Sequence, residues 1–360
     1  MSETRSDPAG AAEPAPDIVP SLDFSPNLAR WLLAQRISLA FTSYQTGRLL
    51  LMGVGPDGRI AFSKQNYTRA MGLHYAEGRL HLASAAQIWR LENILDPGQY
   101  ANRAYDGVFV PRVGHTTGYV DAHDLAVDGE GRVIFVNTRF SCLATIDPVH
   151  SFRELWRPSF ISELAPEDRC HLNGVAVIEG EPAYVTALGE SNEPAGWRAR
   201  KADGGIVIDL RSNEIVARGL CMPHSPRWYD GKLWVLESGQ GRLCTIDPLS
   251  GAKEIVAEVP GFARGLAFAG PFAFIGLSQV RESVFDGIPV AKRSERHCGV
   301  WAVDLRDGKT AGFVRFEGSV QEIFDVQLVP GYRYPDVLEP ADEFTGAAFV
   351  LPETTVQSPA

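Results

Sequence analysis

Apolar and polar residues alternate along most of the chain in short runs that recur at a regular spacing. The segment Leu143–Pro148 is nearly repeated as Leu243–Pro248, 100 residues later. The same pattern occurs at 205–210 and 299–305, and weaker copies occur at 48–52 and 86–91. The copies are therefore spaced by about 50 residues, the length of one four-stranded propeller blade.

A hairpin-like pattern precedes every copy except the first. It consists of a short apolar strand, a turn that usually contains glycine, and a second apolar strand. It occurs at 73–84, 124–137, 174–186, 227–237 and 265–278. A sixth inner strand is found only near the end, at Phe324–Leu328, whereas the first repeat near 39–68 lacks one. The sequence thus predicts an all-β fold, a six-bladed β-propeller closed by a C-terminal strand that completes the N-terminal blade.

The two ends of the chain differ in composition from the repeats. Residues 1–22 are rich in Ser, Ala, Pro and acidic residues, which predicts a disordered tail before a single propeller domain at 23–340. Residues 341–360 are expected to form a C-terminal tail. One helix is predicted at Pro26–Gln35, with Ser25 as its N-cap.

Charge and cysteine content restrict the functional classes. Lys and Arg number 34 against 44 Asp and Glu, a net charge of −10, so nucleic-acid binding is not expected. No apolar run approaches the roughly 18 residues of a membrane span. The five cysteines are odd in number and widely spaced, and the N-terminal segment has no apolar signal sequence. We therefore expect a cytoplasmic protein without a disulfide framework.

Polar residues gather where the inner strands begin, at one mouth of the channel. His74, His123, His171 and His224 start four successive blades. Neutral imidazoles from different strands suit Zn, Cu or Fe, whereas carboxylate and amide oxygens nearby suit Ca or Mg. The alternative is that the histidines satisfy backbone groups around a water-filled channel. The predicted ligands of a divalent ion are His123, His171, Asn173, His224 and Asp325.

Charged side chains at the same mouth supply candidate acid–base and binding groups. An arginine at this mouth, Arg264 or Arg227, suits the binding of a carboxylate or phosphate. The alternative is a structural ion pair with Glu237 or Glu322. A carboxylate in a narrow acidic channel has a raised pKa, so Glu322 or Asp325 is a candidate general base. The predicted catalytic residues are Glu322, Arg264 and Asp124. The predicted substrate-binding residues are Arg227, Glu237 and Arg139.

Three segments carry a family resemblance: Met222–Gly239, Arg264–Gly270 and Gln321–Val326. The chain from about residue 37 to 340 resembles a bacterial family of conserved hypothetical proteins, catalogued as a domain of unknown function. This resemblance implies a propeller-type fold and no particular activity. His171–Ala176 is more distantly similar to the Asn-Gly inner-strand start of gluconolactonase-type six-bladed propellers. That likeness implies a divalent cation at the channel mouth, with Asn173 as the one residue that carries over.

Two functions are compatible with this polar mouth. The first is a metal-dependent enzyme, a hydrolase or isomerase, acting on a small anionic or peptide substrate. The second is a non-catalytic module that binds a peptide or protein. An enzyme should enclose its polar residues in a concave pocket, whereas a binding face should expose aromatic residues on its loops. Trp197 and Tyr119 lie in predicted loops and are candidates for such contacts.

Overall fold

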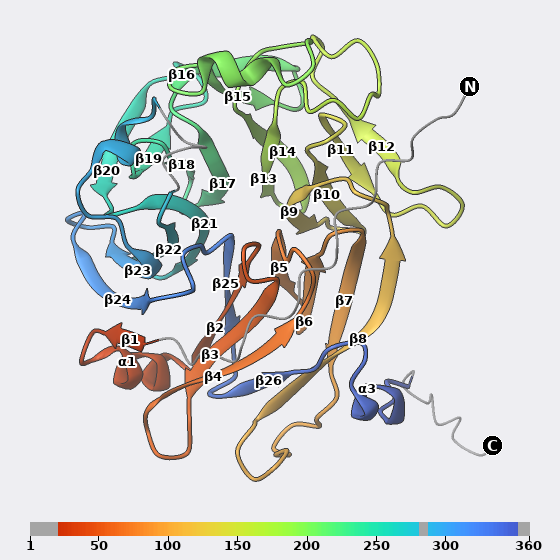
Figure 1. The fold of residues 1–360 in the computed structure, drawn as a ribbon, viewed down its shortest axis with the longest axis vertical. Helices are drawn as coiled ribbons and strands as arrows, with labels where there is room; N and C mark the ends of the chain where they lie inside the picture. The colour runs from red at the N-terminus through yellow and green to blue at the C-terminus, as the bar shows by residue number, and fades with distance from the viewer. Residues whose placement is uncertain (1–20, 281–286, 352–360) are drawn as a thin grey trace, which may run out of the picture.

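The computed structural model describes residues 21–280 and 287–351, which form six sheets around a central channel (Figure 1). Each sheet is one blade, and one inner strand of each blade lines the channel. The inner strands are β5 (Leu73–Ala76), β9 (Ala122–Val127), β13 (Leu172–Ile178), β17 (Pro223–Tyr229), β21 (Phe262–Ala269) and β25 (Asp325–Pro330). The prediction of a six-bladed all-β propeller is confirmed.

Three further antiparallel strands continue each blade outward. The second strands are β6 (Arg79–Ala83), β10 (Val133–Asn137), β14 (Glu181–Ala187), β18 (Lys232–Glu237), β22 (Phe272–Ser278) and β2 (Ile37–Ser43). The third strands are β7 (Gln87–Asn93), β11 (Cys142–Thr145), β15 (Gly205–Asp209), β19 (Arg242–Ile246), β23 (Cys298–Asp304) and β3 (Arg48–Val54). The fourth strands are β8 (Gly107–Thr116), β12 (Arg153–Trp156), β16 (Glu214–Leu220), β20 (Lys253–Glu258), β24 (Thr310–Glu317) and β4 (Ile60–Asn66). The six repeated segments of the sequence are the six third strands.

The ring closes as the repeat pattern predicts. Strand β25 pairs antiparallel with β2, in a register that places Asp325 opposite Thr42 and Pro330 opposite Ile37. The last inner strand therefore completes the blade formed by β2, β3 and β4. This pairing joins the two ends of the propeller and covers a strand edge that would otherwise be open.

Both ends of the domain also add a strand that the sequence pattern does not predict. Strand β1 (Ser21–Phe24) pairs with β24, and β26 (Pro335–Val337) runs parallel to β8. Each end thus contacts two neighbouring blades. Strand β1 begins inside the range predicted as a tail, and residues 1–20 of that range lie outside the described residues. Helix α3 (Glu343–Ala347) falls within the predicted C-terminal tail, whose residues 352–360 are likewise not described.

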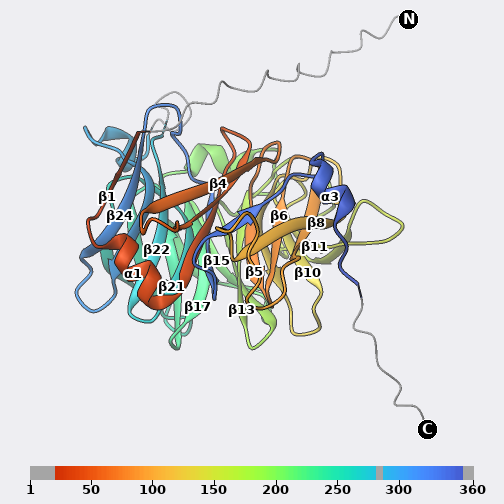
Figure 2. The same cartoon turned by 90° about the horizontal axis from the view of Figure 1, so that it is seen from below.

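The predicted helix forms as α1 (Leu28–Gln35), but its predicted cap is wrong. The Ser25 hydroxyl accepts the backbone N–H of Phe313 on β24 at 3.0 Å instead of capping the helix. The ring of Trp31 packs against Phe274 of β22, at a centroid distance of 5.4 Å. The helix is therefore held by the blades and not by a capping side chain. Figure 2 shows α1 near one face of the disc and the short helix η1 (Gly196–Arg200, green) near the other.

Small residues alternate with larger ones where the inner strands approach one another. Each blade in turn contributes one residue to this alternation: Gly72, Asp124, Gly174, Pro226, Gly265 and Asp325. A Cβ added to Gly72 would lie 2.9 Å from Cα of Asp124, and Gly265 has a left-handed φ of 74° beside Asp325. The glycines therefore allow the next blade to approach closely.

At the other three contacts between neighbouring inner strands, a backbone N–H donates a hydrogen bond to a side chain of the preceding blade. Oδ2 of Asp124 accepts from Val175 at 3.1 Å, and Oδ2 of Asp325 accepts from Leu73 at 2.8 Å. The hydroxyl of Ser225 accepts from Gly265 at 3.0 Å. Polar inner-strand side chains thus join the blades, which explains part of the polar pattern seen at the strand starts.

Two properties of the described residues bear on the sequence expectations. Within 21–280 and 287–351, none of the helices has the length and apolar character needed to span a bilayer. Cys142, Cys170, Cys221, Cys244 and Cys298 are all buried free thiols. Burial raises the pKa of each of these thiols, so they behave as core residues and not as nucleophiles.

Candidate functional site

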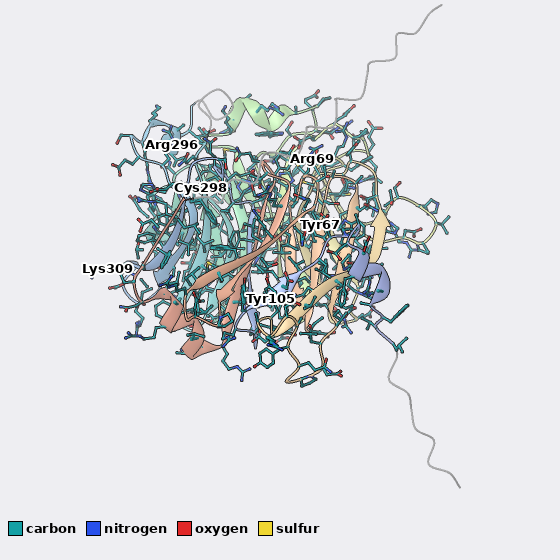
Figure 3. All side chains as sticks on the ribbon, turned by 60° about the horizontal axis from the view of Figure 1, so that its bottom comes forward. Tyr67, Arg69, Tyr105, Arg296, Cys298 and Lys309 are labelled. Carbon is teal, nitrogen blue, oxygen red and sulfur yellow. The ribbon has the colours of Figure 1, made fainter. Side chains whose placement is uncertain are left out.

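A cavity of about 580 Å³ opens at the mouth where the inner strands begin. Its lining includes His123, His171, Arg264, Glu322 and Phe324. This volume is in the range of small-molecule sites. Figure 3 shows Arg69, which also lines the cavity, on the side of the disc that carries η1, with Tyr105 toward the opposite side.

His171 is held in one orientation by a carboxylate. Its Nδ1 lies 2.9 Å from both oxygens of Asp168, and Trp197 donates its indole N–H to the same carboxylate at 3.0 Å. Because a carboxylate only accepts hydrogen bonds, Nδ1 carries the proton of the neutral ring and Nε2 keeps its lone pair. His171 lines the cavity, and within the described part of the chain its hydrogen bonds are all made through Nδ1.

His123 is also a neutral imidazole beside the cavity. Its Nδ1 donates to the backbone carbonyl of Asp121 at 2.8 Å, and its ring meets that of His171 edge-on at a centroid distance of 4.8 Å. Burial lowers the pKa of His123 well below its ordinary value, and a protonated His171 or the charge of Arg264 lowers it further. His123 is therefore a hydrogen-bond acceptor at neutral pH and not a cation.

His224 faces an arginine. Its Nδ1 lies 2.9 Å from the carbonyl of Met222 and 3.0 Å from the hydroxyl of Ser238, so this nitrogen carries the proton. Nη2 of Arg264 lies 3.4 Å from Nε2, the remaining lone pair. Burial and the charge of Arg264 lower the pKa of His224 well below its ordinary value. His224 therefore supports Arg264 as an uncharged neighbour.

Among the described residues, Arg264 has no carboxylate within hydrogen-bonding distance. Its side chain is 15% exposed, and the nearest carboxylate oxygen, on Glu322, is 3.8 Å away. Its guanidinium carbon lies 3.9 Å from the centre of the Phe324 ring. Burial lowers the pKa of Arg264 to about 10, against the opposing charges of Glu322, Asp325 and Tyr44. The group still carries its charge at neutral pH, in a position that favours an anion.

Backbone strain accompanies the mouth of the channel. Asp121, His171 and Met222 directly precede β9, β13 and β17, and all have φ of 50–51°. Arg69, before β5, has φ of 55°. Residues other than glycine seldom adopt this left-handed region, and such strain concentrates at functional sites. Four successive blades thus present strained residues to the same mouth.

Asp124 and Arg227, predicted as catalytic and substrate-binding residues, form an ion pair that does not line the cavity. The two guanidinium nitrogens lie 2.7 and 3.0 Å from the two oxygens of Asp124. Asp325 shares this part of the channel, where burial, followed by the charge of Asp124, raises its pKa to about 7. The partner of Arg227 is thus Asp124, and neither Glu237 nor Glu322. The expectation that a channel carboxylate has a raised pKa is met by Asp325.

Two other predicted binding residues also lie outside the cavity lining. Glu237 is 2% exposed, and its carboxylate accepts from Nζ of Lys253 at 2.9 Å. It also accepts the N–H of Cys221 at 3.1 Å, so its bonds are internal to one blade. The side chain of Arg139 is exposed. Of the predicted catalytic and substrate-binding residues, Glu322 and Arg264 are the ones that line the cavity.

The five predicted metal ligands do not share one coordination sphere. His123 and His171 line the cavity, whereas His224 faces Arg264 and Asp325 lies in the channel. The carbonyl oxygen of Asn173 accepts from Thr186 at 2.6 Å, and its buried NH₂ group, a donor, has no partner among the described residues. In the described part of the chain, no three His, Cys, Asp or Glu side chains converge as a metal site. Metal binding by His123 and His171 stays a prediction.

Sequence reasoning missed Asp168 and misjudged Trp197. Asp168 precedes His171 by three residues, a local spacing that could have indicated the pair. The loop position of Trp197 suggests an exposed binding residue, yet the side chain is 8% exposed and holds Asp168. Tyr119, the other aromatic candidate, is 63% exposed.

Comparison with known proteins places the chain in a family. A family model described as a domain of unknown function (DUF4915) matches residues 26–338. The chain belongs to this family. The match agrees with the resemblance carried by the segments around Met222, Arg264 and Gln321. None of the curated proteins matches the chain.

Solved structures show a related fold. A chain of the nidogen–laminin complex aligns with a TM-score of 0.55 and 11% identity, covering 82% of this chain and 99% of that chain. A catalytically inactive virginiamycin B lyase from Staphylococcus aureus, crystallised with quinupristin, aligns with a TM-score of 0.42 and 11% identity, with the same coverage. At this identity the likeness concerns the fold alone.

Proposed function

We propose that this protein is an enzyme that performs acid–base chemistry, hydrolysis or isomerisation, on a small organic anion. The observation that carries the proposal is the convergence of two unlike groups on one cavity. One is His171, oriented by Asp168 with Nε2 free; the other is the poorly compensated cation Arg264. A base and an anion anchor in one enclosed space are the minimum equipment for proton transfer on a bound acid.

Arg264 binds the anionic group of the substrate. A carboxylate can accept two parallel hydrogen bonds from the planar guanidinium. The ring of Phe324, 3.9 Å from the guanidinium carbon, supports one face of that plane and limits its movement. Glu322 accepts the N–H of Gln45 at 2.7 Å and so lies fixed beside Arg264 at the cavity wall. The anchor is thus oriented before the substrate arrives.

His171 takes the proton. Its Nε2 accepts a proton from a substrate carbon next to the carboxylate or from a water molecule that attacks an ester or lactone. The carboxylate of Asp168 stabilises the imidazolium that forms and keeps Nδ1 protonated throughout. Neutral His123, whose ring lies against that of His171, accepts a hydrogen bond from a substrate hydroxyl.

The test is turnover of a panel of small hydroxy acids, keto acids and lactones, followed by proton NMR in D₂O. Deuterium incorporation beside a carboxylate reports proton abstraction, and ring opening reports hydrolysis. We expect His171→Gln to lower the rate by about 10²–10⁴-fold, the usual size of a general-base contribution. Arg264→Gln should abolish turnover through loss of binding. Arg139→Gln removes an exposed arginine outside the cavity lining and should leave turnover unchanged.

A protein-binding module is the second candidate, and the rim of the cavity favours it. Tyr119 is 63% exposed, and the guanidinium carbon of Arg69 lies 5.9 Å from its ring and 5.0 Å from that of Tyr44. Exposed tyrosines with an arginine are typical of protein interfaces. Absence of turnover and of any anion binding that depends on Arg264 would make this module the preferred function.

Metal content is tested separately. Elemental analysis of the untagged protein beside His123→Ala shows whether the His123–His171 pair retains an ion. An ion held through Nε2 of His171 would occupy the lone pair that the base requires. Stoichiometric metal lost in His123→Ala would therefore contradict the role of His171 as the base.

A further inference from the structure

The cavity contains a second arginine whose charge has no close carboxylate among the described residues. Arg198 belongs to η1 and lines the cavity, and its guanidinium carbon lies 4.9 Å from the centre of the Trp197 ring. Within the described residues it makes no ion pair. The third cavity arginine, Arg69, differs because Nη2 lies 3.0 Å from Asp121. The cavity thus offers two incompletely neutralised cations, Arg264 and Arg198.

The acidic residues of the cavity have other partners. Asp121 pairs with Arg69, and Asp168 accepts from both His171 and Trp197. Glu322 accepts the N–H of Gln45 at 2.7 Å. A ligand anion at Arg198 therefore displaces no carboxylate from that arginine. Because Arg198 is exposed, water screens this contact, and its contribution is that of a surface ion pair.

A continuous wall of rings joins the two arginines. From Arg198 it runs through Trp197, His171 and His123 to Phe324, on which Arg264 lies. Successive ring centroids are 4.4, 4.8 and 5.2 Å apart. The base, His171, therefore lies between the two cations along this wall. A molecule bound by both arginines would extend past Nε2 of His171.

The platform under Arg198 is rigid. Trp197 is 8% exposed and packs in a buried apolar cluster with Met222, Phe262 and Val280. Its indole N–H is fixed by Asp168, while its face carries the guanidinium. One side chain thus orients the base through its edge and positions the second cation with its face. Because Trp197 contacts both Asp168 and Arg198, the position of the second anionic group is fixed relative to that of the base.

We infer that the substrate is a dianion, a small organic acid with two anionic groups such as a dicarboxylate or a phosphorylated carboxylate. This inference rests on the proposed function and specifies its substrate class. Arg264 binds the inner anionic group, Arg198 binds the outer one, and the bond that reacts lies between them beside His171. A monoanion fills only the Arg264 end of the cavity and binds more weakly.

The experiment is isothermal titration calorimetry with two matched series of probes. The dicarboxylates malonate, succinate, glutarate and adipate are compared with monocarboxylates of the same carbon number, propionate to hexanoate. We expect one dicarboxylate length to bind about 2- to 5-fold more tightly than its monocarboxylate, the value of one exposed ion pair. Arg198→Gln should reduce that dicarboxylate to the affinity of the monocarboxylate and leave the monocarboxylate unchanged.

A matched control is available on the same helix. Arg200 pairs with Asp203 at 3.2 Å and does not line this cavity, so Arg200→Gln should alter neither series. Equal affinities for the two series would overturn the dianion as the substrate, and a dicarboxylate preference that survives Arg198→Gln would overturn the assignment of its outer anionic group to Arg198. Monocarboxylate binding that still requires Arg264 would then leave the proposed function standing. Absence of any binding that depends on Arg264 would overturn both.

Discussion

Arg227 and Arg264 lie on the inner strands of adjacent blades, β17 and β21, and are enclosed to a similar degree. Their side chains are 18% and 15% exposed, respectively. Arg227 contacts both oxygens of Asp124 at 2.7 and 3.0 Å, whereas the nearest carboxylate oxygen to Arg264 is 3.8 Å away. Burial lowers the pKa of both, but for Arg227 the charge and hydrogen bonds of Asp124 and the charge of Asp325 together outweigh it, so its pKa is raised.

The two arginines therefore differ in role within one channel, since one joins blades and the other can bind an anion. A guanidinium with a bidentate carboxylate has all the interaction that its charge requires, so it joins blades and binds nothing else. A guanidinium that lies on an aromatic ring, with its carboxylate at a distance, retains the capacity to bind an anion. Residue type and place in the strand are similar for the two arginines, so the neighbours decide the role.

The largest effect on stability is expected at Arg227. Arg227→Met leaves Asp124 buried without its partner and should lower the free energy of unfolding by about 3–5 kcal/mol. Arg264→Met breaks no bidentate ion pair and should cost about 1 kcal/mol or less. Urea unfolding followed by circular dichroism measures both. Equal losses in the two variants would remove the distinction between the arginines.

A large effect on activity, of the same size as that predicted for His171→Gln, is expected at Asp168. In Asp168→Asn the side-chain NH₂ can donate to Nδ1 of His171, which moves the ring proton to Nε2 and removes the basic lone pair. We expect kcat to fall by about 10²–10⁴-fold while KM and anion affinity change little. A rise in KM with unchanged kcat would instead assign Asp168 to substrate binding.

Asp325 should make stability depend on pH. Its pKa is raised to about 7 in the folded protein, above the ordinary value of about 4 for an unfolded chain. Between these two pKa values the folded state therefore retains a proton on Asp325 that the unfolded state loses. The contribution of this proton to the free energy of unfolding is fully present below pH 4 and disappears as pH rises to about 7. Between pH 5 and 8 we expect a loss on the order of 2 kcal/mol.

The control for this pH dependence is Asp325→Asn, which cannot titrate. Unfolding by urea at pH 5, 6, 7 and 8 should give a flatter profile for the variant than for the wild type. Parallel profiles would show that groups other than Asp325 set the slope of stability against pH. The charged neighbours of Asp325 are Asp124 and Arg227.

A small effect is expected at Trp197. Trp197→Phe keeps the aromatic wall and removes one hydrogen bond to Asp168, which should lower the free energy of unfolding by about 1 kcal/mol. The release of Asp168 should also shift the proton NMR signal of the Nδ1–H of His171, which donates to that carboxylate. An unchanged signal would mean that Asp168 is held by His171 alone.

The sequence predicted the arrangement of strands well because that information is local. Apolar alternation, glycine turns and a period near 50 residues indicated six blades and placed Phe324–Leu328 beside the first blade. Strands β1 and β26 were missed because segments of four and three residues carry too little periodic signal. Ser25 was misjudged because its hydroxyl bonds Phe313, which is 288 residues away.

The candidate site shows where sequence reasoning ends. Residue types alone located the mouth and singled out Arg264, Glu322, His123 and His171, all of which line the cavity. Only the tertiary structure assigned Asp124 to Arg227, 103 residues apart, and left Arg264 without an equivalent partner. The physical reason is that apolar periodicity depends on residues that are neighbours in the sequence and follows from the repeating geometry of the backbone. The state of a charge depends on which side chains from other blades come within hydrogen-bonding distance.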